Sequence, residues 1–358
     1  MKKIAVVGLG MMGINHIKAL RGLGYSPYYV IDSDAAKAKK IAFEYGIPNW
    51  SSDLDTALEQ GLDVVHICTP PLSHYESVKK ALEKGVHVIC EKPFVFDEKQ
   101  AEELASLAKE KNLVNAIDFN VRYHQACAQA HEMASEFGSI LLVHGSYCQE
   151  FHALPSVFSW RYDKEQAGKF LATTEIGSHW IDTLRFITGL EVKAVSASYG
   201  CFMADRVVVD GLQYEKGSEP KEGKDFYSDF DNTALVSFRL SNGALANMVL
   251  SEITPGRSNY LEINITGSKK AFWWNTEDLN RYHIGIKGQP VQEHVLAFGD
   301  GFNASIGNML SDVYKDIESG QMSKSHLYAS FEDGLINTKI CNAIYRSAHN
   351  DSVWEEIV

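Results

Sequence analysis

The stretch Lys3–Gly13, KIAVVGLGMMG, decides the fold of the first part of this 358-residue chain. A short apolar run rich in β-branched residues predicts a buried strand, and glycines at 8, 10 and 13 follow it with the spacing G-x-G-x-x-G. Gly8 permits a tight turn, Gly10 lets the backbone approach a pyrophosphate, and Gly13 allows the next helix to pack closely. The stretch therefore predicts a dinucleotide-binding turn at a helix N-terminus.

Asp32 ends the second predicted strand, about 20 residues past the glycines, where a carboxylate accepts hydrogen bonds from an adenosine ribose. The same carboxylate would repel a 2′-phosphate, and the next residue is Ser33 rather than arginine. We therefore predict NAD rather than NADP, with Met11 and Met12 beside the glycines also lining the cofactor. The alternative is that the glycines serve only a strand–helix turn and Asp32 caps the following helix.

Strands and helices alternate through the first 118 residues. The predicted strands are Lys3–Val7, Tyr28–Ile31, Val64–Cys68, Val86–Cys90 and Val114–Phe119, and the predicted helices are Ile14–Leu23, Ala35–Tyr45, Asp55–Gln60, Ser73–Lys84 and Glu98–Lys111. Continuous valine and isoleucine runs between amphipathic helices are typical of a parallel sheet covered on both faces. We predict a doubly wound Rossmann domain over residues 1–118.

Beyond residue 118 the pattern favours an α+β domain, over residues 119–358, built on a large, mostly antiparallel sheet. The predicted strands are Ile140–Gln149, Val192–Met203, Thr233–Leu240, Ala244–Glu252, Tyr260–Gly267 and Lys270–Trp274, and the predicted helices are Ala126–Phe137, Ile176–Thr188 and Ser330–Ala348, the last packing back toward the first domain. Residues 205–230, rich in glycine and charge, predict a surface excursion. An open sheet face needs cover, so we expect a homodimer or homotetramer.

Composition narrows the partners and the compartment. A formal net charge of -12 argues against nucleic acid or an anionic membrane surface, because both require a basic face. The six cysteines contain no C-x-x-C pair and indicate reduced thiols. No apolar stretch approaches the roughly 20 residues of a membrane helix, and the N-terminus does not resemble a signal peptide. A cytoplasmic protein without a metal site is expected, because neither histidine pairs nor cysteine clusters have ligand spacing.

Two further segments follow predicted strands at the carboxyl edge of the sheet. Thr69 and Pro70 come after Val64–Cys68, where their backbone groups would contact the dinucleotide. His74, at the start of the next helix, is either a local hydrogen-bonding residue or a catalytic one. Glu91-Lys92-Pro93 comes after Val86–Cys90, and a lysine at this position predicts proton transfer coupled to hydride transfer; the alternative is a solvated surface lysine.

These motifs resemble the glucose-fructose oxidoreductase, inositol dehydrogenase and MocA family, over nearly the whole chain. The cofactor-side resemblance lies in Gly8–Gly13, Asp32, Thr69-Pro70 and Gly85–Pro93, the substrate-side resemblance in Trp160–Asp163, Ala167-Gly168 and Glu175–Asp182, and the closing helix in Ser330–Leu335 and Ala343–Ala348. The resemblance implies NAD-dependent oxidation of a secondary hydroxyl of a sugar, sugar derivative or cyclitol to a ketone.

The resemblance also implies roles for particular residues. His179 would be the general base and Lys92 its partner, which positions the reacting hydroxyl, while Glu91 would lie beside the cofactor. Many relatives carry aspartate where this chain has Glu175, so the longer side chain leaves the position of the substrate open. The alternatives are a core histidine at 179 and a helix N-terminal carboxylate at 175.

A set of cationic and aromatic residues suggests further contacts with the substrate. Arg122, Arg161 and Lys169 would give the substrate crevice local positive charge, so a phosphorylated or carboxylated sugar is conceivable. These cations also suit ordinary surface ion pairs. Trp160 would present its ring to a sugar or pack between domains, and His152 is a weaker candidate.

Two other classes of function remain open at this stage. A cofactor-using glycosidase of related fold would oxidise its substrate transiently and eliminate from the adjacent carbon. A non-catalytic dinucleotide-binding sensor would report redox state, but it would have no need of the proton-transfer residues.

Overall fold

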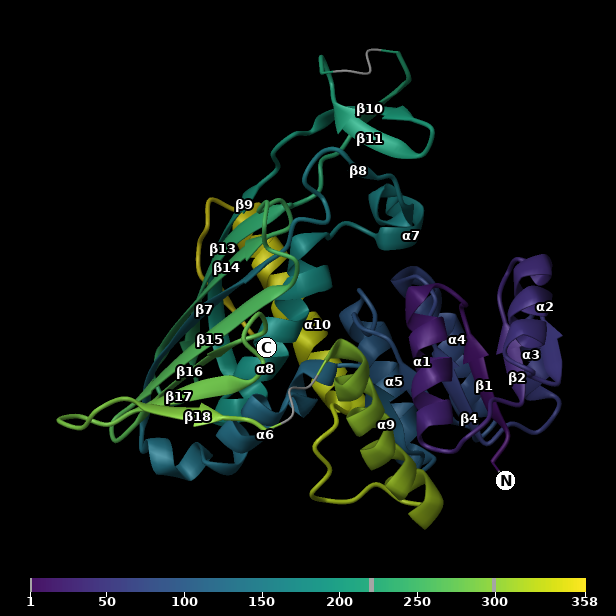
Figure 1. Cartoon of the computed structure of the whole chain (residues 1–358), viewed down its shortest axis with the longest axis horizontal. Helices are drawn as coiled ribbons and strands as arrows, with labels where there is room; N and C mark the ends of the chain where they lie inside the picture. The colour runs from purple at the N-terminus through teal and green to yellow at the C-terminus, as the bar shows by residue number, and fades with distance from the viewer. Residues whose placement is uncertain (1, 219–221, 298–300) are drawn as a thin grey trace. The chain divides into compact units, whose positions relative to one another are not determined.

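The computed structural model describes residues 2–218, 222–297 and 301–358, which form two compact units (Figure 1). The first unit runs to Tyr123 and also contains the helix α9 (Phe302–Ser319) and the chain through Thr338. The second unit begins at His124 and takes up the chain again at Lys339–Val358. Within the described residues, no helix combines the length and apolar composition that crossing a membrane requires.

The first unit is built on a six-stranded sheet in the order β3-β2-β1-β4-β5-β6, with every pair parallel. The strands are β1 (Ile4–Val7), β2 (Tyr29–Ile31), β3 (Asn49–Ser51), β4 (Val64–Ile67), β5 (His87–Cys90) and β6 (Asn115–Ile117). Strands are added outward from β1 to β3 on one side and from β4 to β6 on the other, so the carboxyl ends of β1 and β4 mark the switch point at which doubly wound sheets bind ligands. The predicted Rossmann fold is confirmed; β3, which is not buried, was not predicted.

Helices cover both faces of this sheet, and each face has its own hydrophobic core. The helices are α1 (Met11–Gly22), α2 (Ala35–Glu44), α3 (Leu54–Leu58), α4 (His74–Glu83) and α5 (Glu98–Glu110). Apolar residues of α4 and α5 belong to one core, and those of α1, α2 and α9 to the other. The helix α9 was not predicted, although Ile306, Leu310, Val313 and Ile317 repeat with helical spacing.

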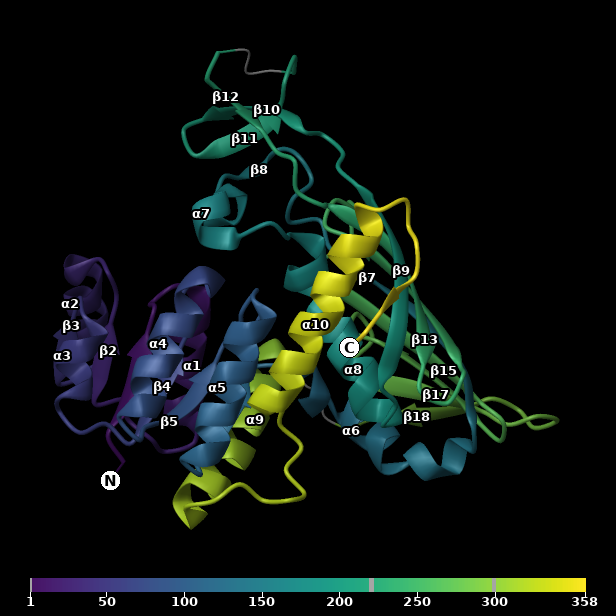
Figure 2. The same cartoon turned by 180° about the vertical axis from the view of Figure 1, so that it is seen from behind.

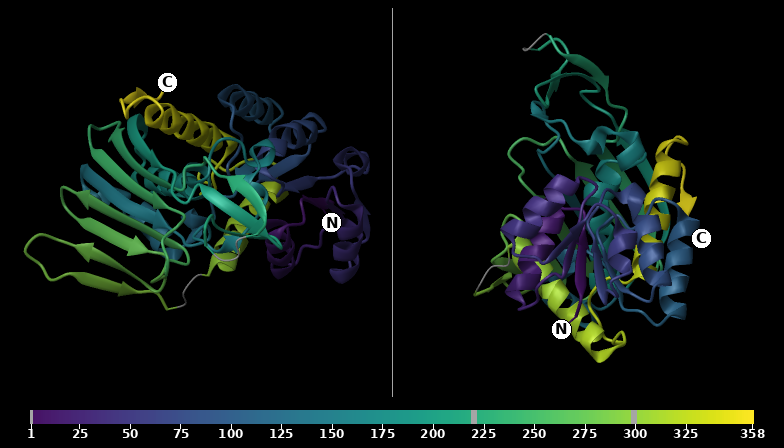
Figure 3. Two further views of the ribbon diagram at one scale, coloured as in Figure 1. Left: turned by 90° about the horizontal axis from the view of Figure 1, so that it is seen from above. Right: turned by 90° about the vertical axis from the view of Figure 1, so that its right-hand side faces the viewer.

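The second unit is built on a nine-stranded sheet in the order β18-β17-β16-β15-β7-β14-β13-β9-β19 (Figures 2 and 3). The strands are β7 (Ile140–Cys148), β9 (Val192–Gly200), β13 (Thr233–Leu240), β14 (Leu245–Ser251), β15 (Tyr260–Gly267), β16 (Ala271–Asn275), β17 (Arg281–Gly285), β18 (Gln292–Val295) and β19 (Glu355–Glu356). Only β7 and β14 pair in parallel among them, so the prediction of a mostly antiparallel sheet is confirmed.

One face of this sheet is buried, because side chains along β13 and β14 alternate between buried and exposed. The helices of the unit are α6 (Gln125–Glu132), α7 (Lys164–Ala167), α8 (Ser178–Thr188) and the second half of α10 (Phe331–Ala348). The Trp180 ring of α8 stacks 5.9 Å from Phe238 of β13. The helix α8 begins at Ser178, two residues after the predicted start at Ile176, and follows a π-helical turn, Thr173–Gly177, which contains Glu175.

A smaller sheet in the order β12-β10-β11-β8 corrects the prediction of a simple surface excursion over residues 205–230. Its strands are β8 (Ser156–Val157), β10 (Asp205–Val209), β11 (Leu212–Glu215) and β12 (Lys224–Tyr227). Tyr162, Leu171 and Phe230 form a small core against Phe158 and Phe226, and this apolar content is what allows the charged segment to fold. Residues 219–221 of the predicted excursion lie outside the described residues.

Candidate active site

The three glycines of the turn between β1 and α1 differ in how much space surrounds them. A Cβ on Gly8, whose φ is +85°, would lie 2.6 Å from the carbonyl oxygen of Cys68, and a Cβ on Gly13 would lie 1.9 Å from that of Gly8. A Cβ on Gly10 would meet no described atom within 4 Å. Packing therefore explains Gly8 and Gly13, whereas the space beside Gly10 is compatible with the predicted close approach of a pyrophosphate, which stays a prediction.

The N-terminus of α1 offers the backbone groups that a pyrophosphate needs. Gly10 is the N-cap and provides no side-chain acceptor, and Met11 and Met12 open the helix directly after it. The first N–H groups of a helix carry partial positive charge and bind anions. These residues fit a dinucleotide, and the roles predicted for them remain proposals.

Asp32 lies just beyond β2 and is already organised by its neighbours. One carboxylate oxygen accepts a hydrogen bond from the Leu9 N–H at 2.9 Å and pairs with Lys37 at the same distance. The other accepts from the Asp34 N–H at 3.1 Å. Burial raises the pKa of Asp32, but the hydrogen bonds from Lys37, Leu9 and Asp34 outweigh it and lower the pKa overall. Asp32 is thus held as a carboxylate beside the glycine turn; Lys37 was not singled out from the sequence.

His74 connects two of the predicted cofactor loops. Its buried ring contacts the Thr69 carbonyl oxygen through Nε2 at 2.9 Å, and the Pro93 and Phe94 carbonyl oxygens through Nδ1 at 3.0 Å. Burial lowers the pKa of His74. The structure therefore gives His74 the local hydrogen-bonding role that the sequence left open, while a contact of His74, Thr69 or Pro70 with the cofactor remains a proposal.

Lys92 follows β5 at the carboxyl edge of the sheet. The Glu91 N–H donates to the Ile67 carbonyl oxygen of β4 at 2.9 Å, which continues the β4–β5 ladder by one residue. The Lys92 N–H donates to Oε2 of Glu91 at 3.2 Å. The half-buried Lys92 therefore follows the end of a strand that lies next to the switch point.

A buried polar cluster that was not predicted from the sequence lies behind Glu91. His16 Nε2 lies 3.2 Å from Oε1 of Glu91 and 3.1 Å from Oδ2 of Asp118. His16 Nδ1 lies 2.8 Å from Nδ1 of His66, whose Nε2 lies 2.9 Å from the hydroxyl of Tyr314. The feature of the sequence that could have indicated this cluster is His16, which lies three residues past Gly13 on the face of α1 that packs on the sheet.

The titratable groups of this cluster have pKa values that are shifted in different directions. Burial lowers the pKa of His16, but Cys68 and the hydrogen bonds to Asp118 and Glu91 outweigh burial and raise it well above its ordinary value. Burial, reinforced by His16, lowers the pKa of His66 well below its ordinary value. Burial and Asp118 raise the pKa of Glu91 to about 7 against the opposing effect of His16. Protons are therefore shared inside the cluster near neutral pH.

His179 lies in the first turn of α8, in the second unit. Its side chain is 7% exposed, and its ring centroid is 6.4 Å from that of Tyr147. Glu175 lies four residues earlier in the π-helical turn, where Oε2 accepts a hydrogen bond from Nε of Arg161 at 2.9 Å. Glu175 raises the pKa of Arg161. The structure thus pairs two of the predicted substrate-binding residues, Glu175 and Arg161, in one unit with His179.

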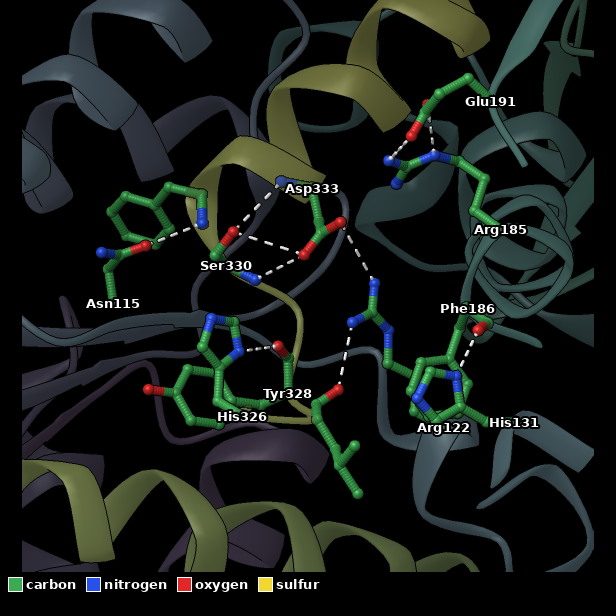
Figure 4. Close-up of polar contacts among 12 residues, drawn as sticks. Asn115, Arg122, His131, Arg185, Phe186, Glu191, His326, Tyr328, Ser330 and Asp333 are labelled. Carbon is green, nitrogen blue, oxygen red and sulfur yellow. Dashed lines mark hydrogen bonds and ion pairs between the residues drawn. The ribbon is translucent and has the colours of Figure 1, made fainter. Parts of the chain in front are cut away.

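The other predicted substrate residues have mixed surroundings. The Arg161 guanidinium stacks 4.7 Å from the Trp160 ring centroid, and exposed Lys169 lies 4.1 Å from that of Tyr345. Arg122, in the first unit, donates to the Leu327 carbonyl oxygen at 3.1 Å and pairs with Asp333 at 3.4 Å (Figure 4). These contacts of Arg122 hold two segments of its own unit together, and its contact with a substrate remains a prediction.

His152 is buried in the second unit beside the small sheet. Its ring hydrogen-bonds the Tyr162 hydroxyl and lies 3.6 Å from Oε2 of Glu252. Buried Arg206 stacks 4.7 Å from the Tyr162 ring centroid. Burial lowers the pKa of His152 to about 4, with Arg161 and Arg206 adding to the effect and Glu175 opposing it. His152 is therefore a neutral histidine that supports Tyr162.

The family models define the class of this protein: a two-unit oxidoreductase with an NAD-binding Rossmann domain. Residues 2–119 match the family model described as "Oxidoreductase family, NAD-binding Rossmann fold". Residues 128–272 match the GFO/IDH/MocA C-terminal domain. The chain belongs to the Gfo/Idh/MocA oxidoreductase family, so the predicted resemblance is confirmed.

Several relatives are similar over most or part of the chain. Levoglucosan dehydrogenase of Pseudarthrobacter phenanthrenivorans is 29% identical over 350 residues, which cover 90% of this chain and 86% of the relative. D-glucoside 3-dehydrogenase of Escherichia coli is 31% identical over 47% of this chain and 48% of the relative. The solved structure of a levoglucosan dehydrogenase in complex with NADH and L-sorbose has a TM-score of 0.90 at 26% identity, covering 100% of this chain and 99% of that one.

Proposed function

We propose that this protein is an NAD-dependent dehydrogenase that oxidises a secondary ring hydroxyl of a sugar, sugar derivative or cyclitol to a ketone. The observation that carries the proposal is the similarity over the whole chain to a sugar dehydrogenase whose structures are described with NADH and with levoglucosan. A scyllo-inositol 2-dehydrogenase of Bacillus subtilis is also similar, at 30% identity over 54% of the chain. A six-membered ring carrying several hydroxyls is the chemistry that these relatives share.

The residues of the first unit suit binding of the cofactor and one contact with the substrate. NAD, when bound, supplies the hydride acceptor. The α1 N-terminus binds the pyrophosphate, and Asp32 accepts the ribose hydroxyls and disfavours a 2′-phosphate. Lys92 donates a hydrogen bond to the reacting oxygen, which stabilises the charge that develops as the hydroxyl loses its proton.

The residues of the second unit suit proton transfer and orientation of the ring. His179 would accept the proton of the reacting hydroxyl at an imidazole nitrogen, while the hydride of the same carbon would go to the bound cofactor. Glu175 accepts a hydrogen bond from a neighbouring ring hydroxyl. Arg161 holds the Glu175 side chain in place through the 2.9 Å hydrogen bond.

A substrate panel tests the proposal. Purified protein and NAD are incubated with levoglucosan, glucosides, inositols, sugar acids and sugar phosphates, and NADH absorbance is followed. We expect at least one neutral pyranose or cyclitol to reduce NAD. Release of an aglycone without net NADH would instead support a cofactor-using glycosidase, and tight NAD binding with no turnover on any compound would support a sensor.

We also propose that the protein is a homo-oligomer, dimer or tetramer, assembled through the exposed face of the nine-stranded sheet. Leu142 pairs with Leu245 across β7 and β14, and Leu235 pairs with Val249 across β13 and β14, and all four are exposed. Exposed apolar pairs on neighbouring strands mark an interaction surface. Light scattering should give a mass of two or four chains, and Leu235→Lys should lower it; a monomer in the unmodified protein would contradict the proposal.

A further inference from the structure

The buried cluster of His16, Glu91 and Asp118, which we call the His16 cluster, joins three separate elements of the first unit. Its members come from α1, from the end of β5 and from the residue that follows β6, and none is more than 5% exposed. Burying two carboxylates is costly unless they share protons or pair with a cation. An arrangement of this kind needs a reason beyond stability, because apolar residues would fill the space at lower cost.

The geometry assigns the charges of the cluster. Nε2 of His16 faces carboxylate oxygens of Glu91 and Asp118, which only accept, so this nitrogen carries a proton. Nδ1 of His16 faces Nδ1 of His66 at 2.8 Å, and one of the two rings must donate there. The pKa of His16 is raised well above its ordinary value while burial lowers that of His66, so the proton between the rings belongs to His16, Nδ1 of His66 accepts, and its Nε2 donates to Tyr314. His16 is therefore an imidazolium with both N–H groups bonded.

The cluster connects directly to Lys92. The Asp118 N–H donates to the Cys90 carbonyl oxygen at 2.9 Å, and the Lys92 N–H donates to Oε2 of Glu91. Glu91 therefore contacts the imidazolium through one carboxylate oxygen and the backbone of the lysine through the other. A change of charge at His16 or Asp118 can therefore affect the Lys92 turn through the side chain of Glu91.

We propose that the His16 cluster is a proton-sharing unit in which His16 and Asp118 position Glu91, and Glu91 positions Lys92 for the reaction. The proposal rests on the role given to Lys92 in the proposed function. His16 and Asp118 act through Glu91 and are positioning residues. One oxygen of Asp118, Oδ1, has no hydrogen-bond partner among the described residues.

Other titratable groups face the cluster from every element packed against it. They are His66 and Cys68 from β4 and the residue after it, Cys90 and Lys92 around Glu91, and Tyr314 from α9 with Tyr25 beside it. Burial raises the pKa of both thiols and of the Tyr314 hydroxyl, which leaves these groups neutral. Lys92 is the cation on the open side of Glu91 and, like His16, favours its carboxylate.

A metal ion is the competing occupant. One ligand atom from each of His16, Glu91 and Asp118 lies within 4.8 Å of the others, a spacing that a cation could also use. The contacts of 3.1 and 3.2 Å from Nε2 to the two carboxylates are hydrogen-bond distances, and one proton satisfies them. We therefore assign a proton to this position, and metal content becomes an outcome of the test.

The experiment follows the Glu91 carboxyl carbon by NMR in protein labelled with ¹³C-carboxyl glutamate and loaded with NAD, with Glu91→Gln identifying the resonance. We expect a titration near pH 7 in the unmodified protein, far above an ordinary glutamate. Replacing the cation, in His16→Gln, should move the midpoint up by about one unit, and removing the second carboxylate, in Asp118→Asn, should move it down by about as much. Glutamine keeps a hydrogen-bond donor near the position of Nε2. If His16 had a purely structural role, the two substitutions would therefore not move the Glu91 midpoint in opposite directions.

Activity and a matched control complete the test. The pH profile of kcat, measured on a substrate found in the panel, should shift to higher pH in His16→Gln and to lower pH in Asp118→Asn. The affinity for NAD should change by less than about threefold in both variants. His87→Asn is the control, because His87 lies at the other end of β5, where its Nδ1 accepts the Val114 N–H at 3.0 Å. It should leave the Glu91 titration unchanged.

The outcomes separate this proposal from the proposed function. Midpoints that move the same way in both variants, or stoichiometric metal in the purified protein that Asp118→Asn removes, would overturn the cluster's role. Opposite shifts at Glu91 with an unchanged kcat profile would overturn its link to Lys92. No turnover on any sugar, with the opposite shifts intact, would overturn the proposed function and leave the proton-sharing unit standing.

Discussion

Two buried histidines, one in each unit, have opposite charge states for reasons that the structure makes plain. His16 lies within 3.2 Å of two carboxylates, and its pKa is raised. His152 lies 3.6 Å from Glu252, hydrogen-bonds Tyr162 and is close to arginines, and burial lowers its pKa to about 4. Burial alone favours the neutral ring in both cases. The comparison teaches that the charge of a buried histidine depends on the groups placed around it.

The difference suits the two units to different tasks. Charge in the first unit lies in the His16 cluster, which contacts the Lys92 backbone through Glu91. In the second unit the neutral His152 supports Tyr162, and the charge is carried by the Glu175–Arg161 pair. Variants at these positions should therefore have effects of graded size on activity and stability.

The largest effect should follow removal of the reacting groups. Lys92→Ala in the first unit and His179→Ala in the second should each lower kcat by about 10²- to 10⁴-fold, because general acid–base groups contribute that much. NAD binding, measured by calorimetry, should persist in both. Turnover that stayed unchanged in both variants would remove the proposed mechanism.

A large effect on stability should come from His152. Its pKa is about 4 in the folded protein and about 6.5 when unfolded, so the unfolded chain binds more protons between these values. Stability is fully present above about pH 6.5 and falls as pH drops toward 4, by about 3 kcal/mol. The free energy of unfolding, measured with urea at several pH values, should depend less on pH in His152→Gln than in the unmodified protein. The control variant His326→Gln should retain the slope of the unmodified protein.

A smaller effect should follow loss of the charge on Glu175. Glu175→Gln keeps the shape but loses the charge-assisted bond with Arg161, so kcat/KM should fall by about 10- to 100-fold, with NAD affinity unchanged. Glu175→Asp shortens the side chain by one methylene and should change the preference among ring hydroxyls. Equal loss on every compound of the panel would argue that Glu175 only holds Arg161.

The smallest effect should be seen at the cofactor. Asp32→Ala should weaken NAD by about tenfold and NADP by less, because it removes both an acceptor for the ribose and the repulsion of a 2′-phosphate. Lys37→Gln, which breaks the 2.9 Å ion pair but keeps the carboxylate, should change NAD affinity less. Equal losses of NAD and NADP in Asp32→Ala would contradict the cofactor preference.

Much of the first unit could be predicted because its signals are local. Runs such as Ile4–Val7 are buried throughout, and Gly8, Gly13 and Asp32 lie within one βαβ segment. The helix α9 escaped prediction, although its apolar spacing was present, because the alternation of strands and helices had already ended by residue 118. In the second unit, β10 to β12 were read as an excursion because charged residues mask the alternation of their apolar ones.

Local sequence patterns were enough to predict the doubly wound sheet, the NAD-binding turn, the family and the residues that carry its motifs. All of these depend on residues close together in the chain, where spacing translates directly into geometry. Only the tertiary structure decided that His16 meets Asp118, 102 residues away, that Tyr314 of α9 meets His66, and that His16 is charged while His152 is neutral. The physical reason is that a pKa depends on burial and on neighbouring charges, and both are set by segments that meet only when the chain folds.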